Sequence, residues 1–87
     1  MPDVDGSGGV ADGELGLRIA AVFGRRLEVV GFGVDDDFFG RGGSSFLAAL
    51  CVADLKKAGV RLAIQDVFLG KTPRAVAERL ESPQRVG

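Results

Sequence analysis

The stretch DDDFFGRGGSSFLAAL, residues 35–50, decides the fold, because an acidic, glycine-rich loop turns here into an apolar helix. Gly42 and Gly43 permit backbone conformations that other residues avoid, and two serines follow them directly. Serine is favoured at the N-cap of a helix, where its hydroxyl accepts a hydrogen bond from an unpaired backbone N–H. The sequence therefore predicts that a long loop ends, and a helix begins, at Ser44 and Ser45.

The composition favours one small helical domain. The chain has 87 residues, of which 46% are hydrophobic. A chain of this size buries only about 60% of its unfolded surface, which leaves no room for a deep catalytic cleft. The six phenylalanines, with no tyrosine or tryptophan, predict an aliphatic core with aromatic anchors.

Catalysis by this chain is not expected. The sequence has no histidine, so it lacks the commonest general base and the commonest neutral metal ligand. Its one cysteine, Cys51, cannot form an internal disulfide, which suits a reducing cytoplasm, and we expect it in the core. We predict a non-catalytic cytoplasmic protein with no bound metal.

The charge pattern argues against nucleic acid and membranes as partners. The net charge is −1; the first 37 residues hold eight acids and three bases, and the rest hold four acids and eight bases. The first part of the chain is therefore acidic and the second part basic, but the chain as a whole offers no net attraction to a polyanion. No apolar run approaches the roughly 20 residues that a membrane span requires.

Apolar spacing predicts two longer helices. The first begins at Glu14, and its apolar residues follow one another at steps of three and four: Leu15, Ile19, Val22, Phe23 and Leu27. The second runs from the serines to Gly59, and its inward face is Leu47, Leu50, Cys51 and Leu55. Residues 1–13 are predicted to be a disordered lead, and residues 82–87 a flexible tail.

Two shorter helices follow an extended linker. One is predicted around residues 66–69. The other opens at Pro73 after the capping residue Thr72, because proline is favoured at the first helical position. The predicted fold class is therefore all-α, a small four-helix bundle with a long first loop and a short third helix.

The long loop, residues 29–43, is expected to be irregular but ordered. Val34, Phe38 and Phe39 are its predicted anchors to the core. The aspartates at 35–37 are interpreted as mainly solvated, with Asp36 orienting the loop through backbone contacts.

Other glycine motifs do not fit residues 40–45. A phosphate-binding P-loop needs a lysine before the serine, and a dinucleotide site needs a preceding strand. A serine nucleophile needs a base, and the chain has no histidine to act as one. By itself, a glycine turn before a serine N-cap is typical of many helices.

The whole window is more specific. Read as D-x-F-F-x-x-G-G-x-S before a bulky apolar residue, it resembles the thiolation motif of peptidyl carrier proteins of nonribosomal peptide synthesis. The matching residues are Asp36, Phe38, Phe39, Gly42, Gly43, Ser45 and Phe46. The resemblance covers residues 14–81, which would form the carrier domain.

The resemblance implies that 4′-phosphopantetheine, taken from coenzyme A, is attached to Ser45 and carries an aminoacyl or acyl group as a thioester. The N-terminus of a helix suits a phosphodiester. Gly42 and Gly43 would keep the approach to the serine open. Ser44 is the competing candidate, and we expect it to cap the helix instead.

The resemblance also implies partners. They are a phosphopantetheinyl transferase, an adenylating enzyme, and condensation, tailoring or thioesterase enzymes that act on a monomeric carrier. The expected docking face spans the second helix and the short third helix, and it consists of Phe46, Val67, Phe68 and Leu69. Arg41 is expected on the rim of this face.

The sequence departs from the family at two positions and in the linker after Lys57, which is one residue shorter than the commonest form. Arg41 stands where leucine is usual, which suggests a dedicated partner, and Glu28 stands where the first helix commonly ends in glycine.

Two other functions stay open at this point. One is an acyl carrier of a polyketide or fatty-acid pathway, although the second helix has one acid and two lysines instead of an acidic face. The other is an unmodified helical interaction module. Because the sequence begins at Met1, we expect a free-standing carrier.

Overall fold

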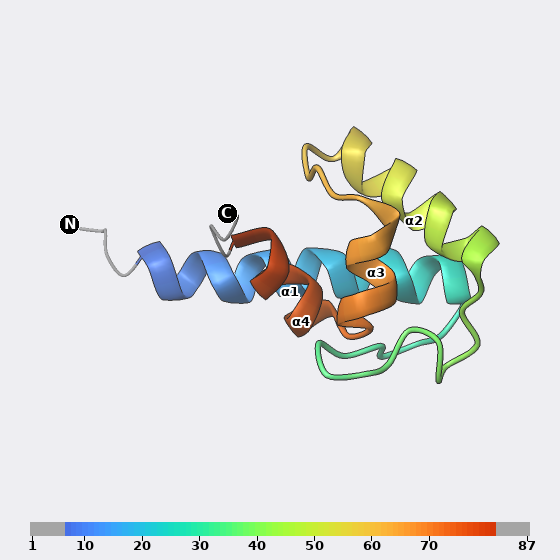
Figure 1. Cartoon of the computed structure of the whole chain (residues 1–87). Helices are drawn as coiled ribbons and strands as arrows, with labels where there is room; N and C mark the ends of the chain where they lie inside the picture. The colour runs from blue at the N-terminus through green and yellow to red at the C-terminus, as the bar shows by residue number, and fades with distance from the viewer. Residues whose placement is uncertain (1–6, 82–87) are drawn as a thin grey trace.

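Four helices make up the protein. The computed structural model describes residues 7–81, in which the helices are α1 (Ser7–Leu27), α2 (Ser45–Lys57), α3 (Ile64–Gly70) and α4 (Pro73–Glu81) (Figure 1). No strand occurs within this range. The all-α prediction is confirmed. No helix among these residues has the length and apolar character needed to cross a membrane.

The longest helix, α1, organises the bundle. It contacts both α2 and α4, while the short α3 contacts α2 and α4 (Figure 1). The long loop leaves the C-terminal end of α1, passes along one side of the bundle and returns to the start of α2 (Figure 1). This is the predicted four-helix bundle with a long first loop and a short third helix.

The first helix begins earlier than predicted. It starts at Ser7 and not at Glu14, so the structure places the second half of the predicted disordered lead in α1. Glycine weakens a helix but keeps its backbone donor, and each residue added to an existing helix gains a hydrogen bond. Residues 1–6 and the predicted tail 82–87 lie outside the described residues.

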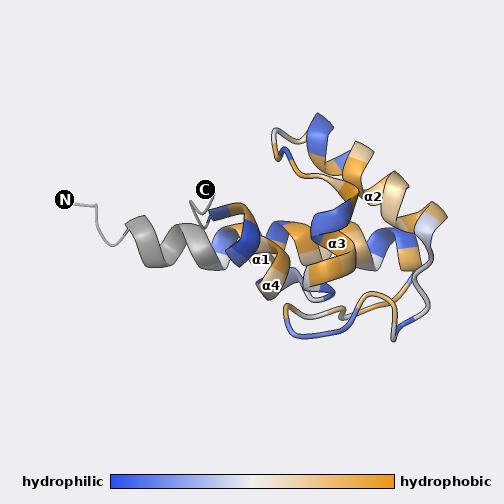
Figure 2. Ribbon diagram, in the orientation of Figure 1, coloured by the Kyte–Doolittle hydropathy of each residue, from blue (hydrophilic) through white to orange (hydrophobic). Residues whose placement is uncertain are grey.

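Hydrophobic residues occur in all four helices (Figure 2), and the burial of their side chains confirms most of the predicted apolar faces. Ile19 and Phe23 of α1 and Cys51 and Leu55 of α2 are fully buried. Partly buried side chains pack around this centre; they are Leu15, Leu27, Phe32, Phe39, Leu47, Val52, Ile64 and Leu80. The buried Ala48 was not predicted to face inward.

The first two helices end in the same backbone motif, but with different residues. At the end of α2, Gly59 has φ of 90°, and the N–H of Val60 donates to the carbonyl of Leu55 at 2.8 Å. At the end of α1, the corresponding residue is Glu28 with φ of 59°. This left-handed position favours glycine, so Glu28 is the strained member of the pair.

Side-chain caps define where the last two helices begin. The hydroxyl of Thr72 accepts a hydrogen bond from the N–H of Ala75 at 3.1 Å, which confirms the predicted cap before Pro73. At α3, the carboxylate of Asp66 accepts a hydrogen bond from the N–H of Ala63 at 2.9 Å. A cap of this kind satisfies a backbone donor that the helix itself leaves unpaired.

Candidate functional site

The two serines at the start of α2 have different roles. Ser44 is the N-cap, with φ −135° and ψ 173°, and its hydroxyl accepts a hydrogen bond from the N–H of Leu47 at 3.2 Å. Its carbonyl accepts another from the N–H of Ala48 at 2.8 Å. The prediction that Ser44 caps the helix is confirmed, so its oxygen is engaged in holding the first turn.

Ser45 is the first residue of α2, and it is exposed. The cap binds the N–H groups of Leu47 and Ala48, which leaves those of Ser45 and Phe46 outside its hydrogen bonds. The first turn holds no acidic residue. Free N–H groups and the positive end of the helix dipole favour a negative group attached at this position.

The two glycines before the serines are needed for different reasons. Gly42 has φ of 108°, a backbone conformation that other residues rarely adopt, and a Cβ added to it would meet open space. A Cβ on Gly43 would instead overlap two ring carbons of Phe38 and lie 2.7 Å from its carbonyl oxygen. Gly43 therefore allows the backbone to pack closely on Phe38. The sequence analysis predicted only that it leaves the approach to the serine open.

Backbone and side-chain hydrogen bonds fold residues 37–43 into consecutive turns. The carboxylate of Asp37 accepts from the N–H groups of Phe39 and Gly40 at 2.9 and 3.0 Å. The N–H of Arg41 donates to the carbonyl of Asp37, and that of Gly43 to the carbonyl of Phe38 at 2.9 Å. The approach to Ser45 is thus irregular but internally bonded.

The aspartate run is exposed at Asp35 and Asp37, as predicted, and each of its carboxylates also accepts hydrogen bonds. The carboxylate of Asp36 accepts from the N–H of Gly33 at 2.7 Å, which confirms its predicted contact with the backbone. Asp35 receives two hydrogen bonds from the guanidinium of Arg74, at 2.7 and 3.1 Å. This arginine lowers the pKa of Asp35 below its usual value through the hydrogen bonds. The sequence analysis did not predict this ion pair, because Asp35 and Arg74 are far apart in sequence.

The loop is also held by backbone bonds to the turn between α3 and α4. The N–H of Phe38 donates to the carbonyl of Lys71 at 2.8 Å, and the N–H of Arg74 donates to the carbonyl of Val34 at 2.9 Å. Two of the three predicted anchors fit this arrangement, because Phe38 is fully buried and Phe39 packs against the core. Val34 is half-buried, and its carbonyl is what holds it here.

Most of the predicted docking residues lie at the surface, and one does not. Phe46, Leu69 and Phe68 are 71%, 64% and 38% exposed. Val67 is fully buried, so its predicted place in an exposed surface is corrected. Successive residues of a helix point about 100° apart, and on α3 it is Val67 that faces the core.

Arg41 makes contacts within its own loop. Its guanidinium lies 3.3 Å from the carboxylate of Asp36 and 6.0 Å from the ring centroid of Phe32. The side chain keeps 44% of its surface exposed. A leucine, which is usual at this position in the family, could not form the ion pair with Asp36. The arginine therefore adds a contact within the loop.

Two ion pairs between helices were not predicted. Arg26 of α1 binds Asp54 of α2 through two hydrogen bonds of 2.7 and 2.9 Å, and Arg79 of α4 lies 3.2 Å from Asp66 of α3. The sequence signal for each is only an acid and a base on neighbouring elements. Among the described residues, no group of three or more His, Cys, Asp or Glu side chains could hold a metal ion.

The chemistry available to Ser45 is that of an acceptor. The chain has no histidine, so it cannot supply the usual base to activate the hydroxyl. An exposed hydroxyl at a helix N-terminus, approached past glycines, is open to another enzyme that brings its own base and a phosphoryl donor. The arrangement suits attachment of a group, with the chemistry performed elsewhere.

Comparison with known families agrees with this chemistry. Residues 17–80 match the family described as "Phosphopantetheine attachment site". The matched range includes the long loop, both serines and all of α2 and α3.

Curated relatives are peptide synthetases. The chain is 42% identical over 55 residues to Nonribosomal peptide synthetase 30 of Fusarium vanettenii, covering 63% of this chain and 1% of that protein. It is 37% identical over 65 residues to a linear gramicidin synthase of Brevibacillus parabrevis, covering 74% of this chain and 1% of that one. This protein thus corresponds to a very small part of each relative.

A solved structure has the same fold. It is that of a thiolation-reductase di-domain from an archaeal non-ribosomal peptide synthetase. The match has a TM-score of 0.75 and 38% sequence identity, and it covers 79% of this chain and 15% of the other.

Proposed function

The chain belongs to the phosphopantetheine attachment site family and is a carrier of the peptidyl type, and we propose that Ser45 is the residue that bears its 4′-phosphopantetheine arm. In the attachment step, the Ser45 oxygen forms a bond to the phosphorus next to pantetheine in coenzyme A. The bond from that phosphorus to the adenosine bisphosphate part breaks, and the serine proton is lost. The arm's thiol then holds an aminoacyl or acyl group as a thioester.

One observation carries this assignment. Ser44 and Ser45 are adjacent, but the Ser44 hydroxyl is committed to the N–H of Leu47, whereas Ser45 is exposed on the first turn of α2. A phosphodiester at Ser45 would lie beside the N–H groups that the cap leaves unbound. Gly42 and Gly43 support the site by shaping the turn that precedes it.

The partners of this carrier are also proposals. Carrier domains of peptide synthetases work with adenylation, condensation and thioesterase partners in general. We propose that a phosphopantetheinyl transferase and an adenylating enzyme act on this chain, followed by condensation, tailoring or thioesterase enzymes. Domains of this family are generally non-catalytic, and we propose the same for this chain. Domain limits of 14–81, a monomeric state, a free-standing chain and a cytoplasmic location stay predictions.

The surface proposed for these enzymes consists of Phe46 on α2 and Phe68 and Leu69 on α3. All three are exposed apolar side chains. Aromatic anchors of this kind carry much of the energy in protein interfaces. Arg41 is proposed to lie on the rim of this surface, where its contact with Asp36 would compete with contacts to a partner.

The acyl-carrier alternative is not favoured, because the relatives named above are peptide synthetases. An experiment distinguishes the modified carrier from the other alternative, an unmodified interaction module. The protein is incubated with coenzyme A and a broad-specificity phosphopantetheinyl transferase, and its intact mass is measured. Candidate adenylating enzymes and their amino acids are then added to the product to find the cargo.

Two variants separate the serines. We expect Ser45→Ala to gain no mass and Ser44→Ala to be modified like the parent. Loss of the cap costs about 1 kcal/mol, so circular dichroism must first show that Ser44→Ala is folded. A modified Ser45→Ala protein would disprove the assignment, and a parent that is never modified would favour the interaction module.

A further inference from the structure

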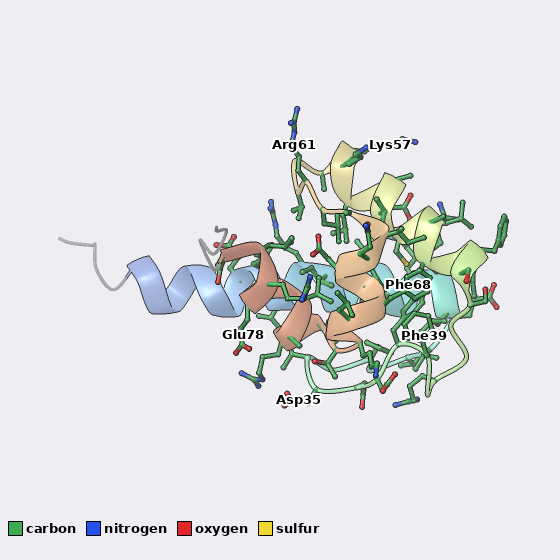
Figure 3. The ribbon with its side chains drawn as sticks, viewed as in Figure 1. Asp35, Phe39, Lys57, Arg61, Phe68 and Glu78 are labelled. Carbon is green, nitrogen blue, oxygen red and sulfur yellow. The ribbon has the colours of Figure 1, made fainter. Side chains whose placement is uncertain are left out.

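A group of basic side chains lies at the end of α2 remote from Ser45. Lys56 and Lys57 are in the last turn of α2, and Arg61 is in the connection to α3; all three are exposed. Figure 3 shows Lys57 and Arg61 projecting from the same end of the bundle. Lys56 and Arg61 also line a surface hollow of about 550 Å³, together with Leu62 and Ala63. We call Lys56, Lys57 and Arg61 the basic end of α2.

The fold offsets only part of this charge, because Lys57 also acts on the carboxylate of Asp54. Asp54, the one acid of α2, is bound by Arg26 through two hydrogen bonds, and these hydrogen bonds lower its pKa. Within residues 13–81, no carboxylate forms a salt bridge with a member of the basic end. Cations suit the C-terminal dipole of a helix, which accounts for the two lysines. Arg61 lies beyond the helix, so the dipole does not account for it.

The exposed face of α2 connects this charge to the attachment end. Phe46, Ala49 and Ala53 are exposed and follow each other at steps of three and four, which places them on one side of the helix. Lys57 continues the same side, about 16 Å from Phe46 at about 1.5 Å per residue. The alanines between them allow another protein surface to approach α2 closely.

From this juxtaposition we propose that the exposed face of α2 docks an acidic partner protein. The partner has an apolar pocket for Phe46 near its own reaction site and a group of carboxylates about 16 Å away that faces the basic end. This inference rests on the proposed function, because a partner that works at Ser45 approaches along the same helix. Complementary charge raises association rates and rejects partners of the wrong sign.

The first test does not depend on modification of Ser45. The ¹⁵N-labelled unmodified protein is titrated with a hexaglutamate peptide and followed by NMR. We expect amide shift changes confined to residues 56–62 and their loss in Arg61→Glu. Arg18→Glu, the same charge change at an exposed position of α1, should respond like the parent. Shifts elsewhere, or shifts that survive in Arg61→Glu, overturn the proposal. A stronger response to a DNA duplex or to anionic vesicles overturns the assignment to protein.

The second test uses loading by an adenylating enzyme. Parent, Arg61→Glu and Arg18→Glu are first fully phosphopantetheinylated, as checked by intact mass, so that failure of attachment is recognised separately. At low salt we expect kcat/KM for loading to fall about threefold to tenfold in Arg61→Glu and to stay within about twofold in Arg18→Glu. The difference should shrink as salt is added, because exposed charges are screened. Equal loading of both variants at every salt concentration overturns the proposal.

Discussion

The ring of Phe39 stacks on the ring of Phe68, with centroids 5.4 Å apart and an angle of 12° between the planes. Phe39 also meets Phe38 edge-on at 5.1 Å, and the buried Phe38 lies 4.6 Å from Phe23. Figure 3 shows Phe39 and Phe68 next to each other beside α3. The row of rings connects α3 to the core through the loop that leads to Ser45.

The stack predicts a measurable coupling between loop and helix. Phe39→Ala, Phe68→Ala and the double variant form a cycle, and we expect a coupling of about 0.5–1.5 kcal/mol in the free energy of unfolding. Urea denaturation followed by circular dichroism measures it. Leu69→Ala is the control, because this residue of the same helix is 64% exposed and should change stability by less than about 0.5 kcal/mol. Additive single effects would show that the rings do not act together.

The close approach of Gly43 to Phe38 predicts a strong effect of one methyl group. We expect Gly43→Ala to destabilise the fold by about 1–3 kcal/mol, since the new atom would overlap both the ring and the carbonyl of Phe38. The melting temperature reports the loss. In Gly13→Ala, the methyl group would meet nothing within 4 Å on a helix, so stability should rise by up to about 1 kcal/mol. A Gly43→Ala protein as stable as the parent would contradict the packing role.

Local signals in the sequence predicted most of the fold. Serine, threonine and proline have specific places at helix starts, so the caps at Ser44 and Thr72 were readable. The start of α1 was not predictable in this way. Glycines in its first turns lower helix stability, but each residue added to an existing helix gains a hydrogen bond, and no local sequence signal shows which effect is larger. The buried side of α3 was predicted wrongly at Val67, because a helix of seven residues has too few positions to define a face.

The place of Ser45 at the start of α2 was predictable from the sequence, and the contacts of the loop before it were less so. The loop depends on pairs such as Asp35 with Arg74, separated by 39 positions in sequence. Such contacts follow from how the chain closes in space, and no local pattern indicates them. The same holds for Gly43, whose steric role depends on where the ring of Phe38 lies.

The left-handed end of α1 predicts a stabilising substitution. Glu28 has φ of 59°, and a residue with a Cβ pays about 1–2 kcal/mol in this conformation. We therefore expect Glu28→Gly to raise the unfolding free energy by about 1 kcal/mol. Gly59→Ala, at the equivalent position of α2 with φ of 90°, should lower it by a similar amount. Thermal denaturation of both variants tests the pair, and a destabilised Glu28→Gly would mean that its side chain has a compensating contact.

The buried thiol predicts loss of stability in strong base. Burial raises the pKa of Cys51 to about 12, whereas the unfolded thiol titrates near its usual value of about 8.5. The folded state therefore holds a proton that the unfolded state has lost between these values. The stabilisation is complete below about pH 8.5 and disappears as pH rises towards 12. Melting temperatures of the parent should fall more steeply over this range than those of Cys51→Ala, in which no thiol titrates. Parallel slopes would show that other groups cause the decline.

Phe46 predicts a functional loss without a structural one. Its side chain is 71% exposed next to Ser45, so Phe46→Ala should change the unfolding free energy by less than about 0.5 kcal/mol. As an aromatic anchor it should nevertheless contribute about 1–3 kcal/mol to partner interaction, seen as a reduced kcat/KM for loading by an adenylating enzyme. Leu17→Ala is the matched control, because Leu17 is 64% exposed on α1, away from the attachment end. If both variants lose loading equally, the effect comes from general surface hydrophobicity. If kcat/KM for loading falls only in Phe46→Ala, the partner contacts the face of α2 next to Ser45.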